Sequence, residues 1–229
     1  YDYHASICLQ GQDPGFTLDD VDTAFAKGIS LKYAQSQQLG DLSWTPSRAG
    51  GTIGASIWTL RSLTDNARVV LVRTAQLARE RVLDASQLLK EKEPDVLIVR
   101  PGRPGSFKKP AAQFTETVQA VLRRDGHVLV PTDAAGRLLE LIYLLEPLNI
   151  PLVVFGPMVP QVLEWTSSLL EWQSTAVQAR FDASQANPWR HLRLTVVTQP
   201  SQLADILAQR PTCVLATGSS LSPGPAAQV

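Results

Sequence analysis

The chain has 229 residues and carries 21 basic against 21 acidic side chains. A formal net charge of zero argues against a protein whose whole surface is built to bind nucleic acid. No apolar run approaches the ~18 residues that a membrane span needs. Two cysteines, Cys8 and Cys213, are too few for a disulfide framework and fit a reducing compartment. Three scattered histidines argue against a histidine-rich metal centre.

The first hundred residues predict one helix and one hairpin. Residues 17–20, Thr-Leu-Asp-Asp, indicate a helix start with Thr17 as cap, and apolar residues at helical spacing continue it up to Gly28. Residues 52–63 and 68–74 are rich in β-branched side chains and flank the polar segment 64–67, which predicts a hairpin. The charged segment 79–93 is expected to be partly helical.

From residue 95 onward, short apolar runs alternate with helical patterns. The runs expected to be strands begin at Asp95, His127, Leu152, Leu192 and Cys213, and helices are expected from residues 113, 134 and 158. Uniformly apolar strands that alternate with helices indicate a mostly parallel sheet with both faces covered. The side chains expected to be buried there are those of Val130, Leu141, Leu145 and Val154.

A Pro/Gly-rich stretch, residues 100–110, lies between these two patterns. We therefore predict a domain boundary there. The predicted fold class is α/β, with a more antiparallel first part and a Rossmann-like second part.

Two glycine-containing stretches do not fit a dinucleotide-binding loop. Residues 102–105 follow a predicted strand, but their spacing is not that of G-x-G-x-x-G. They also contain a proline, which lacks the N–H group that cradles a phosphate. Residues 218–224 fit no better. We interpret residues 102–105 as a linker.

The isolated histidines favour structural roles. His127 begins a predicted strand and is expected at the surface or at a strand edge. His191 follows Asn-Pro-Trp-Arg, and no second histidine or acid has metal-ligand spacing to it, so we expect it to pack against aromatic side chains. His4 supports no inference.

Asp133 ends a predicted strand, directly before a predicted helix that begins with Gly136 and Arg137. Ligands of α/β sheets gather at the carboxyl ends of strands, so a functional role is one interpretation. The interpretation we favour is that Asp133 caps the helix.

Four basic residues with no acid among them also occur within ten positions: Arg100, Arg103, Lys108 and Lys109. Such a loop can contact phosphate, although charged loops are usually only solvated.

Five segments in order along the chain carry a family resemblance: residues 16–25, 49–58, 95–99, 124–141 and 187–191. Through them the sequence resembles the metallo-β-lactamase/β-CASP family of RNA-processing nucleases. Within that family it looks closest to the metal-free pseudonuclease subunits of the cleavage and polyadenylation specificity factor. Residues 133–141 are the most specific match, because the active nucleases have a different residue where this chain has Asp133.

The resemblance implies a domain organisation. Residues 1–99 would be the later part of a metallo-β-lactamase domain, without that fold's first sheet. Residues 100–229 would be a Rossmann-like β-CASP domain, incomplete at its C-terminus, with a mostly parallel sheet.

The resemblance also implies that catalysis is absent. Gly51 stands where active members have a zinc-binding histidine, and Thr74 where they have a zinc-bridging aspartate. Arg100 replaces the acid of the first β-CASP motif. Glycine offers no ligand, threonine offers no anionic or imidazole ligand, and arginine repels a dication, so no metal ion, cofactor or catalytic residue is expected. The family's other histidine motifs would lie outside this chain.

The function implied is that of a nuclear, catalytically inactive scaffold subunit in pre-mRNA 3′-end processing. Its partners would be the active nuclease paralogue, a symplekin-type scaffold and the module that recognises the polyadenylation signal. Two alternatives stay open: the analogous pseudonuclease of the integrator complex, and a zinc-dependent RNA endonuclease with rearranged ligands. No membrane partner is expected.

Contact with pre-mRNA is an expectation for two groups of residues. In the resembling nucleases, the Gly-Arg that opens the 136–145 helix lies beside the cleft where the RNA backbone passes, so Arg137 could bind phosphate. The alternative that we favour is that Arg137 pairs with an acid such as Glu140 or Asp133. The loop residues Arg100, Arg103, Lys108 and Lys109 could form a weak, salt-sensitive RNA contact.

Overall fold

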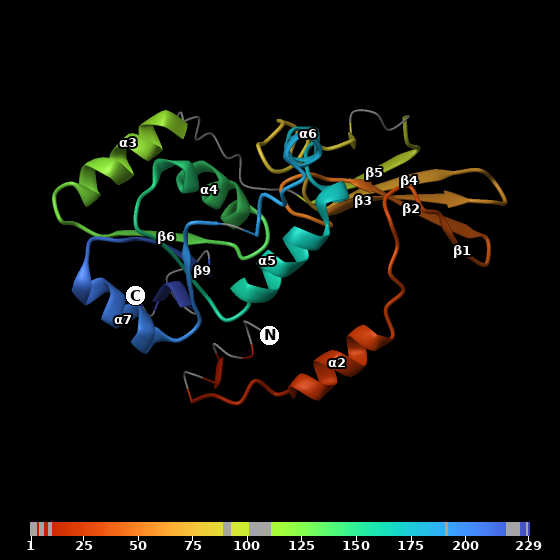
Figure 1. The fold of residues 1–229 in the computed structure, drawn as a ribbon. Helices are drawn as coiled ribbons and strands as arrows, with labels where there is room; N and C mark the ends of the chain where they lie inside the picture. Colours follow the sequence, from red (N-terminus) through yellow and green to blue (C-terminus); the bar gives the residue numbers. More distant parts are fainter. Residues whose placement is uncertain are drawn as a thin grey trace. The chain divides into compact units, whose positions relative to one another are not determined.

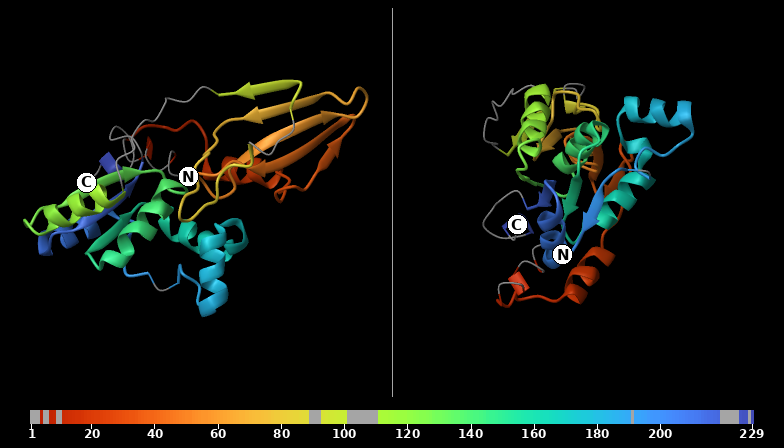
Figure 2. Two further views of the ribbon diagram at one scale, coloured as in Figure 1. Left: turned by 90° about the horizontal axis from the view of Figure 1, so that it is seen from above. Right: turned by 60° about the vertical axis from the view of Figure 1, so that its left-hand side comes forward.

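The computed structural model describes residues 4, 7–8, 11–88, 93–100, 111–190, 192–218, 225–227 and 229. The chain forms two compact units (Figures 1 and 2). The first comprises residues 1–27, 107–170 and 180–229, and the second comprises residues 28–106 and 171–179. The division into domains at residues 99 and 100 stays a prediction, and the 101–110 part of the predicted linker lies outside the described residues.

The second unit is built on a five-stranded sheet in the order β1-β2-β3-β4-β5. The strands are β1 (Gln37–Leu39), β2 (Leu42–Arg48), β3 (Ser56–Ser62), β4 (Arg68–Val72) and β5 (Val96–Val99). The first three pairings are antiparallel and the last, between β4 and β5, is parallel (Figure 2). The carboxyl ends of β2, β4 and β5 therefore lie at one edge of the sheet.

The predicted hairpin is formed by β3 and β4, with Arg61 opposite Arg68. Its turn contains Asn66 in the left-handed region at φ 64°, and Asp65 Oδ1 accepts the Ala67 N–H at 3.1 Å. Asparagine and aspartate favour such turns because their side chains hydrogen-bond locally. The first strand begins at Ser56, later than predicted, because Ala55 N–H closes a turn onto the Thr52 carbonyl.

A small apolar cluster holds one end of this sheet together. Ala49, Ile57, Val70 and Val72 are buried there, at 0–5% exposure. β5 differs from the other predicted strands, because it pairs with β4 and is no part of the parallel sheet of the first unit. Its four apolar side chains are 49–52% exposed.

Within the segment 79–93, which was expected to be partly helical, residues 79–87 are neither helix nor strand. Tertiary hydrogen bonds take the place of helical ones in this segment. Ser86 N–H donates to the Gln76 carbonyl at 2.7 Å, and Gln87 N–H donates to the Arg48 carbonyl at 2.8 Å. The segment is thus fastened to the end of β2, which overrides the weak helical preference of its charged residues.

The first unit contains the predicted parallel sheet, in the order β6-β9-β7-β8. Its strands are β6 (Val128–Thr132), β7 (Leu152–Phe155), β8 (Thr195–Val197) and β9 (Cys213–Thr217). All three pairings are parallel, which confirms the βαβ prediction. β8 is shorter than predicted, because residues 192–194 are not in the strand.

Helices cover both faces of this sheet, with α3 and α4 on one side and α7 on the other (Figure 1). The helices are α3 (Ala111–Leu122), α4 (Arg137–Leu145), α5 (Val159–Ser168), α6 (Thr175–Ser184) and α7 (Pro200–Gln209), with short 3₁₀ turns at η2 (Glu146–Leu148), η3 (Leu170–Trp172) and η4 (Pro225–Ala227). The first three confirm predicted helices within three residues, whereas α6 and α7 were not predicted. Leu203 of α7 packs with Val153, Phe155 and Val214.

Two of the four burial predictions are confirmed and two are wrong. Leu145 and Val154 are fully buried. Val130 is only half-buried because β6 is an edge strand of its sheet. Leu141 is also half-buried, because α4 turns Leu138, Ile142 and Leu145 inward and leaves Leu141 outside this stripe.

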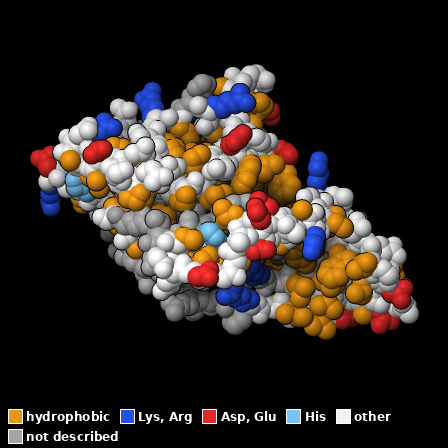
Figure 3. All heavy atoms as spheres, turned by 90° about the horizontal axis from the view of Figure 1, so that it is seen from below, with side chains coloured by type: hydrophobic (Ala, Val, Ile, Leu, Met, Phe, Trp, Pro, Cys, Tyr) orange, Lys and Arg blue, Asp and Glu red, His pale blue; other side chains and the backbone are white. Residues whose placement is uncertain are grey.

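The predicted N-terminal helix is α2 (Leu18–Ala26), and its cap is confirmed. Thr17 and Asp20 form a reciprocal capping box, in which each side chain accepts the other's backbone N–H, at 3.2 and 2.8 Å. Apolar side chains also reach the surface in clusters (Figure 3), and Phe25, Ile29 and Leu39 are each more than 70% exposed. Among the helices of the described chain, none is long and apolar enough to cross a membrane.

Candidate functional site

The two substituted ligand positions and the substituted motif acid of the resemblance follow strands that end at one edge of the five-stranded sheet. Gly51 follows β2 by three residues, Thr74 follows β4 by two, and Arg100 directly follows β5. Because these strands run in the same direction, their carboxyl ends meet at this edge. The three positions that the resemblance assigns to one site therefore follow strands that end at the same edge of the sheet.

Hydrogen bonds fix the loops of this edge to one another. Gln76 N–H donates to the Ala49 carbonyl at 2.9 Å, which joins the segment after β4 to the loop after β2. Arg100 N–H donates to the Val72 carbonyl at 3.0 Å and extends the β4–β5 pairing by one residue. Thr74 and Arg100 are exposed, and Gly51 is half-buried.

The two glycines of this edge have left-handed backbones, at φ 73° for Gly50 and 75° for Gly51. A Cβ on Gly50 would lie 3.1 Å from Gln76 Cβ and 3.3 Å from the Asp84 carbonyl oxygen, so no side chain fits there without a shift. At Gly51 the nearest atom would be Gln76 Cβ at 3.7 Å, an ordinary contact. A side chain at Gly51 is thus opposed by its backbone conformation and not by space.

Asp84 is paired with two arginines near this edge. Asp84 binds Arg48 at 3.4 Å and Arg79 at 3.1 Å, and its carboxylate also accepts the Thr175 N–H at 3.2 Å. Arg48 also lies over the ring of Tyr33, 5.9 Å from its centroid. Burial raises the pKa of Tyr33, whose hydroxyl donates to the Ala55 carbonyl at 3.0 Å. The Asp84 carboxylate is therefore committed to two arginines.

A different arrangement lies where β6 ends in the first unit. Asp133 Oδ1 accepts the N–H groups of Gly136 at 2.7 Å and Arg137 at 3.0 Å, so the favoured prediction that Asp133 caps the helix is confirmed. The α4 helix begins at Arg137, because residues 134–136 form the turn that brings Asp133 to the helix N-terminus. Arg137 is exposed and Glu140 is buried. An Arg137 pairing with Glu140 stays a prediction.

The remaining predicted residues divide into described and undescribed ones. His127 is exposed next to the start of β6, and its Nδ1 accepts the Thr212 N–H at 3.3 Å, so its predicted place is confirmed. Arg103, Lys108, Lys109 and His191 lie outside the described residues.

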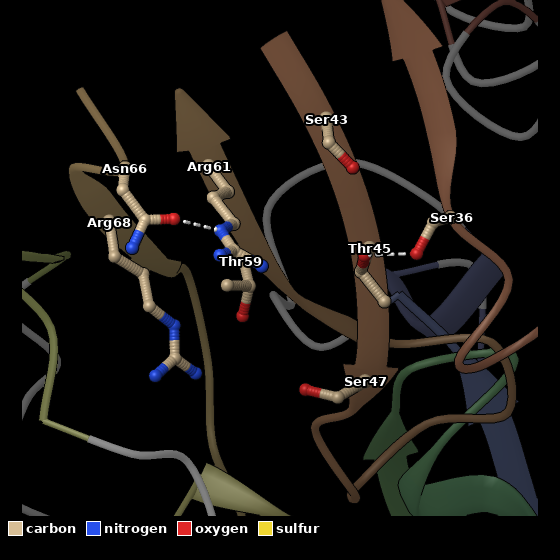
Figure 4. A pocket seen from close by; sticks show the side chains of 8 residues that line it. All are labelled: Ser36, Ser43, Thr45, Ser47, Thr59, Arg61, Asn66 and Arg68. Atoms are coloured by element: carbon tan, nitrogen blue, oxygen red, sulfur yellow. Dashed lines mark hydrogen bonds between the residues drawn. The ribbon is translucent and has the colours of Figure 1, made fainter. Parts of the chain in front are cut away.

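Sequence reasoning missed a polar groove on one face of the β2–β3–β4 sheet (Figure 4). Its volume is about 530 Å³, and its lining residues are Ser36, Ser43, Thr45, Ser47, Thr59, Arg61, Asn66 and Arg68. The missed signal is the alternation of hydroxyl residues in the sequence Ser43–Ser47, which places them on one face of β2.

A comparison with protein families covers the first part of the chain. A family model described as a metallo-beta-lactamase superfamily domain matches residues 1–103. Over residues 1–103 the chain is therefore similar to the metallo-β-lactamase superfamily. This match contains the five-stranded sheet and the edge that carries Gly51, Thr74 and Arg100.

Similarity to curated proteins extends beyond residue 103. The chain is 30% identical to the probable cleavage and polyadenylation specificity factor subunit 2 of Drosophila melanogaster, over 98% of this chain and 32% of that protein. It is also 30% identical to cleavage and polyadenylation specificity factor subunit 2 of Arabidopsis thaliana, over 93% of this chain and 31% of that protein. The chain thus spans about a third of the length of these relatives.

Two more distant matches have other descriptions. Ribonuclease TTHA0252 of Thermus thermophilus is 29% identical, over 93% of this chain and 50% of that protein. A crystal structure of a protein of unknown function from Enterococcus faecalis V583 is similar with a TM-score of 0.40 and 12% identity, over 86% of this chain and 46% of that one.

The resemblance to metallo-β-lactamase nucleases implies a zinc site, and the described residues at this sheet edge are not suited to bind zinc. Zinc ligands in proteins are thiolates, imidazoles and carboxylates. Gly51, Thr74 and Arg100 supply none of these, and Asp84 is held by Arg48 and Arg79. Within the described part of the chain, no cluster of three or more His, Cys, Asp or Glu side chains could hold a metal ion.

Proposed function

We propose that this chain belongs to a catalytically inactive subunit of the pre-mRNA 3′-end cleavage and polyadenylation machinery. The observation that carries the proposal is 30% identity over 98% of the chain to a protein named as a specificity factor subunit of that process. Identity that continues along the whole chain links both structural units to the same relative.

Inactivity is supported by the chemistry of the sheet edge. The resemblance assigns a zinc histidine, a zinc aspartate and a motif acid to positions that hold Gly51, Thr74 and Arg100. A hydrolytic zinc centre activates water by lowering its pKa, and it needs anionic or imidazole ligands to hold the metal. In this proposal the domain keeps the fold of the nuclease and positions a partner.

The proposed partners follow from the resemblance. They are the active nuclease paralogue of the same family, a symplekin-type scaffold and the module that recognises the polyadenylation signal, all in the nucleus. Pre-mRNA is a further proposed partner, contacted by the loop residues Arg100, Arg103, Lys108 and Lys109, while Arg137 is proposed to pair with an acid. The exposure of Arg100 is compatible with an RNA contact.

Co-purification tests this proposal. The affinity-tagged protein is isolated from nuclear extract, and its partners are identified by mass spectrometry. We expect the active nuclease paralogue together with subunits of the polyadenylation machinery. Recovery with integrator subunits instead would assign the chain to the analogous complex, and recovery with neither would overturn the proposal.

A second candidate is a zinc-dependent RNA endonuclease with rearranged ligands. The similarity to a protein named as a ribonuclease favours it. The two candidates differ in metal content, because an active enzyme of this kind carries about two zinc ions per chain. Elemental analysis of the purified protein, dialysed against metal-free buffer, distinguishes them. Stoichiometric zinc would support the endonuclease.

A further inference from the structure

A groove of about 400 Å³ lies at the amino ends of the parallel strands in the first unit. Segments 149–152 and 192–195, which lead into β7 and β8, line it together with Arg210, which precedes β9. Because the strands are parallel, this edge of the sheet is opposite to the edge where Asp133 follows β6. We call it the amino-end groove.

The amino-end groove is lined by two arginines and by no acid. Both arginines are exposed. Arg193 Nη1 donates to Asn149 Oδ1 at 3.3 Å, which orients the guanidinium without neutralising its charge. Among the described residues, neither Arg193 nor Arg210 has an acidic partner within ion-pair distance. Two positive charges therefore line this groove without a counter-ion from the described chain.

Aliphatic side chains surround these charges. Ile150, Leu192 and Leu194 line the amino-end groove and are only half-buried, so a ligand can cover more of their apolar surface. No aromatic side chain lines the groove, so the bases of an RNA strand would find no ring to stack on. The lining suits a ligand with both acidic and aliphatic groups, which a peptide has and a nucleic acid lacks.

A second groove, of about 250 Å³, continues this surface, because Leu192 lines both grooves. Arg180 lines the second groove, lies 5.8 Å from the centroid of the Tyr143 ring and donates to the Tyr143 hydroxyl at 3.4 Å. Glu146 also lines it, and the Glu146 carboxylate has no partner among the described residues. A carboxylate at this place repels a phosphate, but it can pair with a basic side chain of a peptide.

We propose that these two adjoining grooves bind an acidic segment of a partner protein, with carboxylates of the segment on Arg193 and Arg210. The inference deepens the proposed function, and it rests on that function for the idea that this chain positions protein partners. The planar guanidinium groups match the geometry of carboxylates. Exposed ion pairs are individually weak, so aliphatic side chains of the segment contribute by packing against Leu192 and Leu194.

The test is a titration of the whole chain with a short, fluorescein-labelled peptide in which aspartate alternates with leucine and proline. Fluorescence anisotropy measures binding at two salt concentrations. The control peptide has asparagine in place of each aspartate. We expect the acidic peptide to bind about threefold to tenfold more tightly than the control peptide, mainly at low salt. Equal affinities, or no binding of the acidic peptide, would overturn the proposal.

The Arg193→Gln/Arg210→Gln variant is expected to bind the acidic peptide about threefold to tenfold more weakly than the wild type. The matched control is Arg123→Gln/Arg124→Gln, which removes the same charge from exposed residues just beyond the end of α3. Equal losses in the two double variants would mean general electrostatic attraction, and the proposal would then be wrong. Thermal unfolding of each variant checks that it is folded.

Two further variants separate the charged contacts from the apolar ones. Leu194→Ser should weaken binding about threefold at either salt concentration, because salt does not screen an apolar contact. Arg193→Glu/Arg210→Glu should lose the acidic peptide and bind a peptide of the same design with lysine in place of aspartate. A folding defect would not produce this exchange of ligands. A charge-reversed variant that still prefers the acidic peptide would contradict the proposal.

Single-stranded RNA and a second copy of the chain are the other occupants to test. Labelled RNA that binds more tightly than the acidic peptide, and that is lost in Arg193→Gln/Arg210→Gln, would reject the peptide in favour of nucleic acid. Self-association in sedimentation experiments that disappears in the same variant would reject it in favour of a second copy. The titrations use the chain without any complex. Their failure would therefore leave the co-purification result, and with it the proposed function, untouched.

Discussion

Gly156 and Thr217 lie so close together that a Cβ on Gly156 would meet Cγ2 of Thr217 at 2.7 Å and its Oγ1 even nearer. Gly156 directly follows β7 and Thr217 ends β9, its neighbour in the parallel sheet. Thr217 is fully buried, and its Oγ1 has no hydrogen-bond partner among the described residues. The carboxyl ends of these two strands therefore depend on the absence of a side chain at Gly156.

Gly156→Ala is therefore expected to destabilise the chain. The added methyl group overpacks a closed site, which costs about 1–3 kcal/mol in the free energy of unfolding. Urea unfolding measures this loss. The Gly156→Ala/Thr217→Ala double variant should recover most of it, because it removes the two atoms that clash. A double variant no more stable than the single one would contradict this account.

Asp133→Ala should destabilise the start of α4. The carboxylate accepts the N–H groups of Gly136 and Arg137, and loss of a helix cap costs about 1 kcal/mol. Asp133→Asn keeps an acceptor oxygen and serves as the matched control, with stability near that of the wild type. Thermal unfolding of both variants measures the difference. Equal stability of Asp133→Ala and the wild type would show that these hydrogen bonds contribute nothing.

Restoring two ligand types at the sheet edge is not expected to create a nuclease. In Gly51→His/Thr74→Asp, Arg100 stays as a cation near the site, and the left-handed backbone at Gly51 opposes histidine by about 1–2 kcal/mol. Zinc analysis and an RNA cleavage assay are the measurements. Cleavage above the background of the wild type would count against the assignment of an inactive domain.

The two cysteines should differ sharply in reactivity. Cys213 is fully buried in β9, and burial raises its pKa from 9.0 to about 12, whereas Cys8 is exposed. Iodoacetamide at about pH 8 should therefore modify Cys8 and spare Cys213 until the chain unfolds, because the thiolate is the reactive form. Peptide mass spectrometry reads out each site.

The same burial gives stability a defined pH dependence. The unfolded thiol ionises near pH 9.0 and the folded one near 12, so the folded state retains the proton more tightly. This contribution is fully present below pH 9.0 and is lost as the pH rises towards about 12. A Cys213→Ala variant should lose less stability over that interval. An equal loss in the variant would assign the effect to other groups.

The basic loop and Arg137 are expected to act differently on RNA. Alanine at Arg100, Arg103, Lys108 and Lys109 together should weaken RNA binding at low salt and matter less at high salt. Arg137→Ala should lower stability and leave RNA affinity unchanged, as expected for a residue that pairs with an acid. Anisotropy titrations combined with thermal unfolding separate the two effects. Wild-type affinity of the loop variant at low salt would reject the RNA contact.

Helix caps and strands could be predicted from the sequence where the residues that determine them lie only a few positions apart. Thr17 and Asp20 carry a complete capping signal, and Asp133 lies within hydrogen-bonding reach of the helix that it caps. The parallel strands were predictable because burial on both faces makes them uniformly apolar, as β7 and β9 are. The observed starts of a strand and a helix differ from the predicted ones where turns precede them, at residues 52–55 and 134–136.

Elements that depend on distant partners escaped prediction. Pro46 lies within β2, between β1 and β3, and a proline there argues against a strand because it cannot donate to the ladder. Residues 79–87 are held by hydrogen bonds to Gln76 and Arg48, which no local pattern reveals. The groove was missed for the same reason, because Arg61 and Arg68 meet only when the hairpin forms.

The exposed strand β5 has a consequence for handling this chain. It ends the order of its sheet, and no described strand pairs with its outer edge, so its Val-Leu-Ile-Val backbone is a template for strand addition by another molecule. Asp95 and Arg100 flank the strand with opposite charges, which cancel and give this edge no net repulsion against another strand. Self-association should therefore grow with protein concentration, and Leu97→Lys is expected to suppress it.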